Sequence, residues 1–301
     1  MRAGLNVLTV DVEDYFHVQA FADQVSPRTW AKYSSRVVQN THRVLRLLKE
    51  HDVQATFFVL GWVADRFPRL VRDILDDGHE IGCHSFFHRL IYELTPDEFR
   101  EDLLMATKAI GEITGGPVQA YRAPSFSVTN RSLWALDVLI DEGYRYDSSI
   151  FPIRHDHYGL PGAERFPHLI ERSHGALWEF PPSTIRLGRW NVPVAGGGYL
   201  RLYPLRLSLR WMDQLNRVER QPFLCYVHPW ELDPEQPRLP GRWKSRWRHY
   251  QNLRTTQRKL QAVLSRYRFA PLGDVLKSCG IEKCVSFDEA VAERPLGVST
   301  G

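Results

Sequence analysis

The chain has 301 residues, 43% of them hydrophobic and 12% aromatic, so it is long enough for one barrel or two small domains with a full core. The formal net charge of +4 at pH 7 gives no electrostatic reason to expect nucleic acid as a partner. No uncharged apolar run reaches 18 residues, and the first residues lack the apolar core of a secretory signal. We therefore expect a protein without a transmembrane segment, located in the cytoplasm, with its four cysteines reduced.

Apolar runs typical of β-strands alternate with segments of helical periodicity along the chain. The strand-like runs are residues 5–10, 55–60, 79–83, 118–122, 144–147, 176–180 and 222–228. Helices are expected at 35–49, 68–76, from the capping box Thr95–Glu98 onward, after Asn130, at 203–218 and at 255–268. This alternation predicts an α/β fold built on a parallel sheet.

No linker or change in composition divides the chain, so one domain is expected over residues 1–278, followed by a C-terminal tail at 279–301. Residues 151–175 are expected to form a long loop, and residues 231–254 show no clear periodicity. Gly196–Gly198 lack the setting of a dinucleotide site and are expected to let the backbone approach the rim of the barrel closely.

An Arg- and Trp-rich stretch lies within residues 242–248. Aromatic rings stack on sugar rings and arginine binds phosphate, so this stretch could dock an anionic glycan or a lipid pyrophosphate carrier. A solvated surface with the long side chains lying along it is the simpler interpretation.

Five polar residues stand at the end of strand-like runs or just beyond them. They are Asp11, His84, Arg122, Asp147 and His228. In a barrel of parallel strands the carboxyl ends of the strands converge on one rim, where active sites are built. These side chains are those that metal-assisted hydrolysis requires, and packing alone does not explain their placement.

A metal site is expected from the pair His84 and His88 together with the acidic cluster that begins at Asp11. Residues four apart on a helical turn share a face, and neutral imidazole suits zinc and other divalent first-row metals. Buried carboxylates repel one another unless a cation compensates them. We expect Asp11 to be the base and Asp14 the metal ligand, with Glu13 as a close second for the metal.

Arg122 is expected to hold Asp11 through a bidentate ion pair. Pro124 stiffens the turn that follows, so a backbone N–H near Ser125 or Phe126 could face a developing oxyanion. A surface arginine before a proline turn is an equally good interpretation of the residues alone.

His228 ends a strongly apolar run and could serve as the general acid for the leaving group. A core histidine bonded to a backbone carbonyl is the simpler alternative. Asp147 or Glu231 could orient the imidazole, and the sequence does not choose between them. Trp230, two residues further on, is expected to contact the substrate.

At these residues the chain resembles the polysaccharide deacetylase family, carbohydrate esterases that share the nodulation-deacetylase homology domain. The five family motifs are matched in order by TVDVED, HSFFH, RAPSF, DSS at 147–149 and YVHP. The similarity covers about residues 5–270 and is closest to a subgroup encoded with bacterial exopolysaccharide and exosortase loci. In contrast to the adjacent aspartates usual in the first motif, Val12 and Glu13 separate Asp11 from Asp14 here.

The resemblance implies a single distorted barrel of about seven parallel strands with rim-loop insertions, including a family-specific C-terminal part from about residue 200. It implies a divalent metal held by an Asp-His-His set, first zinc, then Co²⁺, Ni²⁺ or Mn²⁺, with Asp11 as base, Arg122 as its partner and His228 as acid. The expected reaction removes N-acetyl groups from a glycan of exopolysaccharide biosynthesis, which could be lipid-linked and bring the protein to the inner membrane.

Two other functions are compatible with these residues. Some relatives with a shifted first motif act on small amides such as allantoin, so a ureide hydrolase of the same fold is the second hypothesis. A glycan-binding module without catalysis is the third, and the complete set of base, ligands, arginine and acid argues against it.

Overall fold

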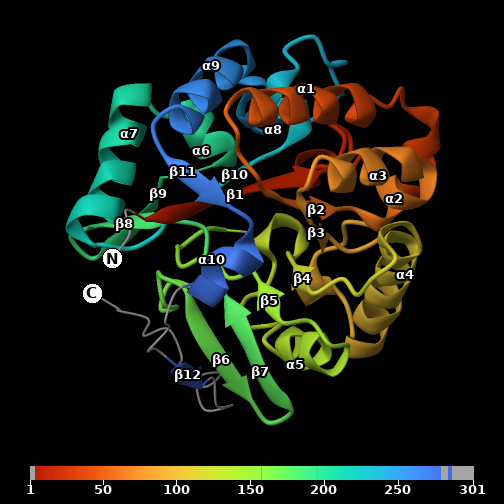
Figure 1. Cartoon of the computed structure of the whole chain (residues 1–301). Helices are drawn as coiled ribbons and strands as arrows, with labels where there is room; N and C mark the ends of the chain where they lie inside the picture. Colours follow the sequence, from red (N-terminus) through yellow and green to blue (C-terminus); the bar gives the residue numbers. More distant parts are fainter. Residues whose placement is uncertain (1–3, 157, 195, 279–283, 287–301) are drawn as a thin grey trace, which may run out of the picture.

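The computed structural model describes residues 4–156, 158–194, 196–278 and 284–286. A mostly parallel sheet lies at the centre, and helices surround it (Figure 1). Its strands are β1 Leu5–Val12, β2 Thr56–Val59, β3 Glu80–Cys83, β4 Ala120–Tyr121, β5 Tyr146–Asp147, β6 His168–Arg172, β7 Gly175–Glu179, β10 Leu224–Val227, β11 Arg268–Ala270 and β12 Cys284–Ser286. The predicted tail at 279–301 lies outside the described residues, apart from β12.

The helices are α1 Val37–Glu50, α2 Gly61–Arg66, α3 Pro68–Asp76, α4 Pro96–Thr114, α5 Trp134–Asp141, α6 Gly197–Leu202, α7 Leu205–Asp213, α8 Trp243–Tyr250, α9 Leu253–Leu264 and α10 Leu272–Ser278. The predicted capping box starts α4: Thr95 accepts from the Glu98 N–H and Glu98 accepts from the Thr95 N–H. Across the described part of the chain, every helix is too short or too polar to span a bilayer.

The α/β prediction is confirmed, with two additions to its parallel pattern. The strands lie in the order β10–β1–β2–β3–β4–β5–β7–β6–β12, and β11 pairs with the first residues of β1. From β10 to β7 each pair is parallel, whereas β6 returns antiparallel to β7. A separate antiparallel hairpin is formed by β8 Thr184–Leu187 and β9 Trp190–Pro193.

Three segments differ from the sequence expectation. The expected loop at 151–175 contains β6, because residues 168–172 can pair with β7 across a tight connection. The segment 231–254 contains helix α8, whose polar and aromatic residues obscure the apolar period. The last predicted helix ends at Leu264, and the chain then enters β11 beside β1.

The register of the strands positions the site. Val12, Val59, Cys83 and Tyr121 form one line of paired residues across the parallel strands β1 to β4. The residues that follow Val12, Cys83 and Tyr121 are Glu13, His84 and Arg122, so all three emerge at the same edge of the sheet. On the other side of β1, Val10 pairs with Val227, which brings His228 to the same edge.

Glycines allow one close approach beside β10. Gly196 forms a bridge with Tyr226, and a Cβ atom at Gly196 would lie 2.3 Å from the Tyr226 ring. The backbone angle φ of Gly196 is +130°, which an L side chain rarely adopts. The expectation that this glycine run serves backbone approach is confirmed.

Candidate active site

Glu13, His84 and His88 form a buried cluster at the carboxyl edge of the sheet. One potential ligand atom from each lies within 4.8 Å of the others. His88 Nε2 lies 2.9 Å from Glu13 Oε2. All three side chains are buried, so this is a compact set of two imidazoles and one carboxylate.

The donor atoms of this cluster fit a divalent metal. His84 Nδ1 donates to the Arg122 carbonyl oxygen at 2.8 Å, which leaves the lone pair of Nε2 available. Burial lowers the pKa of His84 to about 4, so its imidazole is neutral at pH 7. Glu13 Oε2 is buried without a hydrogen bond of good geometry among the described residues, and the ring nitrogen that faces it at 2.9 Å, His88 Nε2, is itself a potential ligand of an ion. Burial alone would raise the pKa of Glu13, but neighbouring His88, His228 and His84 hold it well below its usual range.

The preference for Asp14 as the metal carboxylate does not agree with this geometry. Asp14 Oδ2 accepts from the backbone N–H groups of Arg36 and Val37 and from the Ser35 hydroxyl, at 2.6–3.1 Å. The carboxylate thus satisfies free N–H groups where α1 begins. Glu13, the second choice, is the carboxylate that the structure brings to His84 and His88.

Asp11 lies beside this cluster and is held by Arg122. Arg122 Nη1 donates to Asp11 Oδ1 at 2.8 Å and to the Thr9 hydroxyl at 2.6 Å. The predicted ion pair is present, but it is not bidentate, since the remaining guanidinium donors bind the Ser148 hydroxyl and carbonyl oxygens. The guanidinium also lies 4.4 Å from the centre of the Phe58 ring. Arg122 is therefore a buried, fixed cation that orients Asp11.

Residues 147–149 anchor Arg122 instead of reaching the imidazole of His228. Ser148 accepts from Arg122, and the Ser149 hydroxyl accepts from the Ala123 N–H at 2.8 Å and donates to Asp147. Asp147 is fully buried on β5 and is paired in register with Glu179 of β7. The expected catalytic role of Asp147 does not match this position, because its carboxyl group faces Glu179 and Ser149.

The pair Asp147–Glu179 should make stability depend on pH. Burial raises the pKa of Asp147 to about 6, and burial together with Asp147 raises that of Glu179 well above its usual range. The folded state therefore binds more protons than the unfolded state above about pH 4, so the pair contributes stability at low pH that is lost as the pH rises. We expect Glu179→Gln to be more stable than the unmodified chain at pH 8 by on the order of 2 kcal/mol, and to differ little from it at pH 4.

Urea unfolding at both pH values measures this difference, with the exposed Glu235→Gln as the control substitution. A stability gain that is equal at pH 4 and pH 8 would contradict the raised pKa values of the two carboxyl groups.

The Nε2 atom of His228 faces Asp11 of β1 and Glu13, the residue after β1, and Glu231 contacts the other ring nitrogen. Its Nε2 lies 3.7 Å from Asp11 Oδ2 and 3.6 Å from Glu13 Oε1. Its Nδ1 lies 3.2 Å from Glu231 Oε2, which also accepts from the His228 backbone N–H. Burial opposes protonation, but Glu231, Glu13 and Asp11 raise the pKa of His228 to about 9. The imidazole of His228 thus contacts Glu231 and not Asp147. A pKa of about 9 keeps His228 protonated at pH 7.

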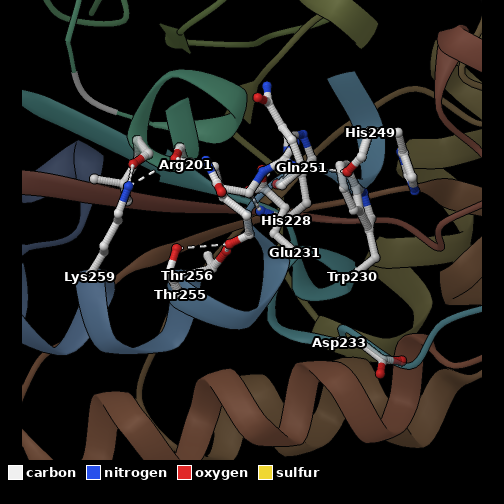
Figure 2. A network of polar contacts seen from close by, with 12 residues as sticks. Arg201, His228, Trp230, Glu231, Asp233, His249, Gln251, Thr255, Thr256 and Lys259 are labelled. Carbon is white, nitrogen blue, oxygen red and sulfur yellow. Dashed lines mark hydrogen bonds and ion pairs between the residues drawn. The ribbon is translucent and has the colours of Figure 1, made fainter. Parts of the chain in front are cut away.

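Glu231 is in turn held by Arg201 at the end of α6 (Figure 2). Arg201 Nε donates to Glu231 Oε1 at 2.7 Å, and Nη1 donates to the carbonyl oxygens of His249 and Gln251. Burial would raise the pKa of Glu231, but Arg201 and His228 lower it to about 2. The carboxylate therefore remains charged behind the imidazole.

Trp230 is a buried residue that packs against His228 and Glu13. It is 5% exposed, its Nε1 donates to Glu13 Oε1 at 3.1 Å, and its ring stacks between those of His228 and His249. Figure 2 shows the stack of Trp230 and His249 beside His228. The expected contact of Trp230 with substrate does not match this burial, since its faces and its polar atom are already engaged.

In the turn after Arg122, one of the two backbone N–H groups expected to face an oxyanion, that of Phe126, is already used in a hydrogen bond. The Phe126 N–H donates to the Ala123 carbonyl oxygen at 3.0 Å, and the Phe126 ring packs against Tyr226. Ser125 and Phe126 both have φ of +52°, and the metal-cluster loop has φ of +62° at Ser85 and +52° at His88. Such angles are costly for these residues and are typical of functional sites.

Sequence reasoning missed two contributors to the site. His17 is buried, and its Nδ1 accepts from the Asp14 N–H at 2.9 Å. Burial lowers the pKa of His17 to about 3, and its ring packs against Trp30 and Trp62. Arg201 was not considered, since only the fold brings α6 behind Glu231. Neither residue has a sequence signal beyond its type.

Two family models match adjacent parts of the chain. The polysaccharide deacetylase model matches residues 28–146, and a domain of unknown function (DUF3473) matches residues 148–277. His84, His88 and Arg122 lie in the first match, whereas His228 and Glu231 lie in the second. The site thus draws on both matched regions, and on Asp11 and Glu13, which precede the first of them.

Relatives of known name match a part of the chain. A peptidoglycan-N-acetylglucosamine deacetylase of Bacillus cereus is 33% identical over 98 residues, covering 32% of this chain and 36% of that protein. A peptidoglycan-N-acetylmuramic acid deacetylase of Bacillus subtilis is 37% identical over 84 residues, 28% of this chain and 32% of that protein. A chitooligosaccharide deacetylase of Azorhizobium caulinodans is 36% identical over 85 residues, 28% of this chain and 40% of that protein. The matched part spans about a third of the length of these relatives.

Solved structures share the fold over most of the chain. A Mycobacterium smegmatis protein assigned as a polysaccharide deacetylase has a TM-score of 0.60 at 20% identity, covering 90% of this chain and 88% of its own. The Puue allantoinase has a TM-score of 0.55 at 15% identity, with the same coverage. At these identities the likeness shows a common fold. The family model assigns residues 28–146 of this chain to the polysaccharide deacetylase family.

Proposed function

We propose that this chain is a metal-dependent hydrolase that removes N-acetyl groups from an N-acetylated sugar of a bacterial exopolysaccharide or its precursor. The observation that carries the proposal is the cluster of Glu13, His84 and His88 with His228 beside it, within 4 Å of both Asp11 and Glu13. The names of the relatives, which act on peptidoglycan or chitooligosaccharides, support the same reaction class.

Glu13, His84 and His88 are the residues that would hold the cation. Two imidazoles and one carboxylate suit Zn²⁺ first, and Co²⁺, Ni²⁺ or Mn²⁺ also accept such ligands. A divalent cation bound there would supply Lewis acidity toward the acetyl carbonyl group and toward water.

Asp11 and His228 divide the proton transfers between them. Asp11, oriented by Arg122, accepts the proton of the water that attacks the acetyl carbon. His228 is protonated at neutral pH and donates its Nε2 proton to the nitrogen that leaves the acetyl group. Glu231 keeps the imidazole oriented and stabilises its positive charge during this step.

Acetate release from chitooligosaccharides tests the proposal. The zinc-loaded protein is expected to release acetate, and removal of the metal by a chelator is expected to abolish the activity, which added zinc restores. Allantoin serves as the competing substrate, because a ureide hydrolase of this fold would turn it over. Turnover of allantoin alone would replace glycan deacetylation by the second hypothesis.

An Asp11→Asn variant keeps the size of the side chain but removes the base. It should bind metal like the parent chain and lose about 10²–10⁴-fold in activity. If it retained full activity, the assignment of Asp11 would be wrong.

A further inference from the structure

An open hollow of about 660 Å³ lies beside helix α8, outside the cluster at the sheet edge. We call it the α8 hollow. It is lined by Arg238, Trp243, Arg246, Trp247 and Tyr250, together with Leu202 and residues 251–252. A volume of this size is typical of sites for small ligands or for part of a chain.

The hollow lies in a segment that carries positive charge only. Between residues 236 and 273 the sequence has ten lysines and arginines and no aspartate or glutamate. Five of these cations are exposed on or beside α8: Arg238, Arg242, Lys244, Arg246 and Arg248. None of the five forms an ion pair with a residue that the structure describes, whereas Arg36, Arg122, Arg165, Arg201 and Arg266 each have a carboxylate partner. These five guanidinium and ammonium groups are available to an anion.

Aromatic surface is exposed at the same place. Trp243 is 73% exposed and Trp247 is 56% exposed, which is unusual for so large an apolar side chain. The Arg238 guanidinium lies 4.1 Å from the centre of the Tyr250 ring. Flat aromatic faces beside free cations can stack on sugar rings while the cations bind carboxylate or phosphate groups.

The α8 hollow is connected to the site by short contacts. His249 of α8 stacks on Trp230 at 4.2 Å between ring centres, and Trp230 stacks on His228 at 5.1 Å. The Gln251 carbonyl oxygen, at the side of the hollow, accepts from Arg201, which holds Glu231. Helix α8 spans about 12 Å, so its two ends are within reach of a short stretch of one polymer.

Arg248 also acts electrostatically on Tyr199. Burial raises the pKa of Tyr199, whereas Arg248 opposes that rise. Tyr199 shares a hydrogen bond with Tyr158, and the Tyr158 ring packs against Phe126 of the turn after Arg122.

We propose that the α8 hollow binds an acidic glycan chain, one that carries uronate or phosphate groups, and so holds a polymeric substrate at a distance from the sugar that reacts. This inference rests on the proposed function and specifies its substrate class. A glycan fits better than a membrane surface, because helix α8, which carries these tryptophans and arginines, contacts the network that holds His228 and Glu231.

Binding of polygalacturonate, a uronic acid polymer, tests the inference with the full chain. The double variant Arg246→Ala/Trp247→Ala is compared with Arg189→Ala/Trp190→Ala, which removes the same residue types from the β8–β9 hairpin. The first pair is expected to raise the Kd at least about 10-fold, and the control pair to leave it within about twofold. Binding to the parent chain should weaken as salt is raised, because exposed charges are screened.

Acetate release from a short, neutral chitooligosaccharide separates this inference from the proposed function. Both double variants should deacetylate it as the parent chain does, since neither pair belongs to the catalytic cluster. If the parent chain released no acetate, the proposed function would fail, whatever the binding result.

Three results would overturn the inference about the hollow. The first is equal affinity of both double variants for polygalacturonate. The second is that Arg246→Ala/Trp247→Ala loses as much affinity for long neutral chitin fragments as for polygalacturonate, which would show that acidic groups are not needed. The third is binding of the parent chain to phosphatidylglycerol vesicles that depends on Arg246 and Trp247, with no binding of polygalacturonate.

Discussion

Glu13→Gln is expected to weaken zinc binding by at least about 100-fold, whereas Asp14→Asn should keep the affinity within a few-fold of the parent chain. Glu13, His84 and His88 each offer a ligand atom within 4.8 Å of the others, and removing even an outer-shell partner of a metal ligand costs about 10–100-fold. The Asp14 carboxylate instead binds the start of α1. Its loss should lower the free energy of unfolding by on the order of 1 kcal/mol.

Competition with a chromophoric chelator measures the zinc affinity of both variants, and urea unfolding measures their stability. His84→Ala provides the reference for a lost ligand. The assignment would be reversed if Asp14→Asn lost the metal and Glu13→Gln retained it, because Glu13 would then have no role in holding the ion.

Glu231→Gln is expected to lower kcat/KM by about 10²-fold and to move the alkaline limb of its pH profile to lower pH. His228 must be protonated to act as the acid, so activity falls as the pH rises through its pKa of about 9. Glu231 contributes both a hydrogen bond and a negative charge to that pKa. The neutral amide keeps the shape but removes the charge, so the defect should be larger at pH 8.5 than at pH 6.5.

Asp147→Asn is the matched comparison, since the sequence offered Asp147 and Glu231 as equal candidates. Its carboxyl group contacts Ser149 and Glu179, so its removal should leave the alkaline limb in place. Profiles of acetate release from pH 6 to pH 10 separate the two variants. A shift of the limb in Asp147→Asn alone would assign the orienting role to Asp147.

The sequence predicted the part of the site that depends on strand ends. Apolar runs mark where β3, β4 and β10 stop, and the polar residue after each run is His84, Arg122 or His228. Because parallel strands end at one edge, their proximity followed from the pattern alone. The same reasoning predicted the α/β sheet and the helices between its strands.

The choice between neighbouring carboxylates could not be predicted in this way. Whether Glu13 or Asp14 faces the histidines depends on where α1 begins, more than twenty residues later in the chain. The partner of His228 likewise depends on Arg201, which the fold brings to Glu231 from thirty residues away. Such long-range contacts have no signature in local periodicity. Helix α8 was missed because its exposed tryptophans and arginines give no apolar stripe.

The position of β1 has a consequence for how the protein acquires its activity. This first strand lies between β2 on one side and β10 and β11, from the last third of the chain, on the other. During synthesis one edge of β1 stays unpaired until its partner β10, about 210 residues later in the chain, has left the ribosome. The proposed base, Asp11, and the proposed acid, His228, are thus more than 200 residues apart in the chain, so a chain that ends before β10 lacks one of the two groups that the proposed reaction needs.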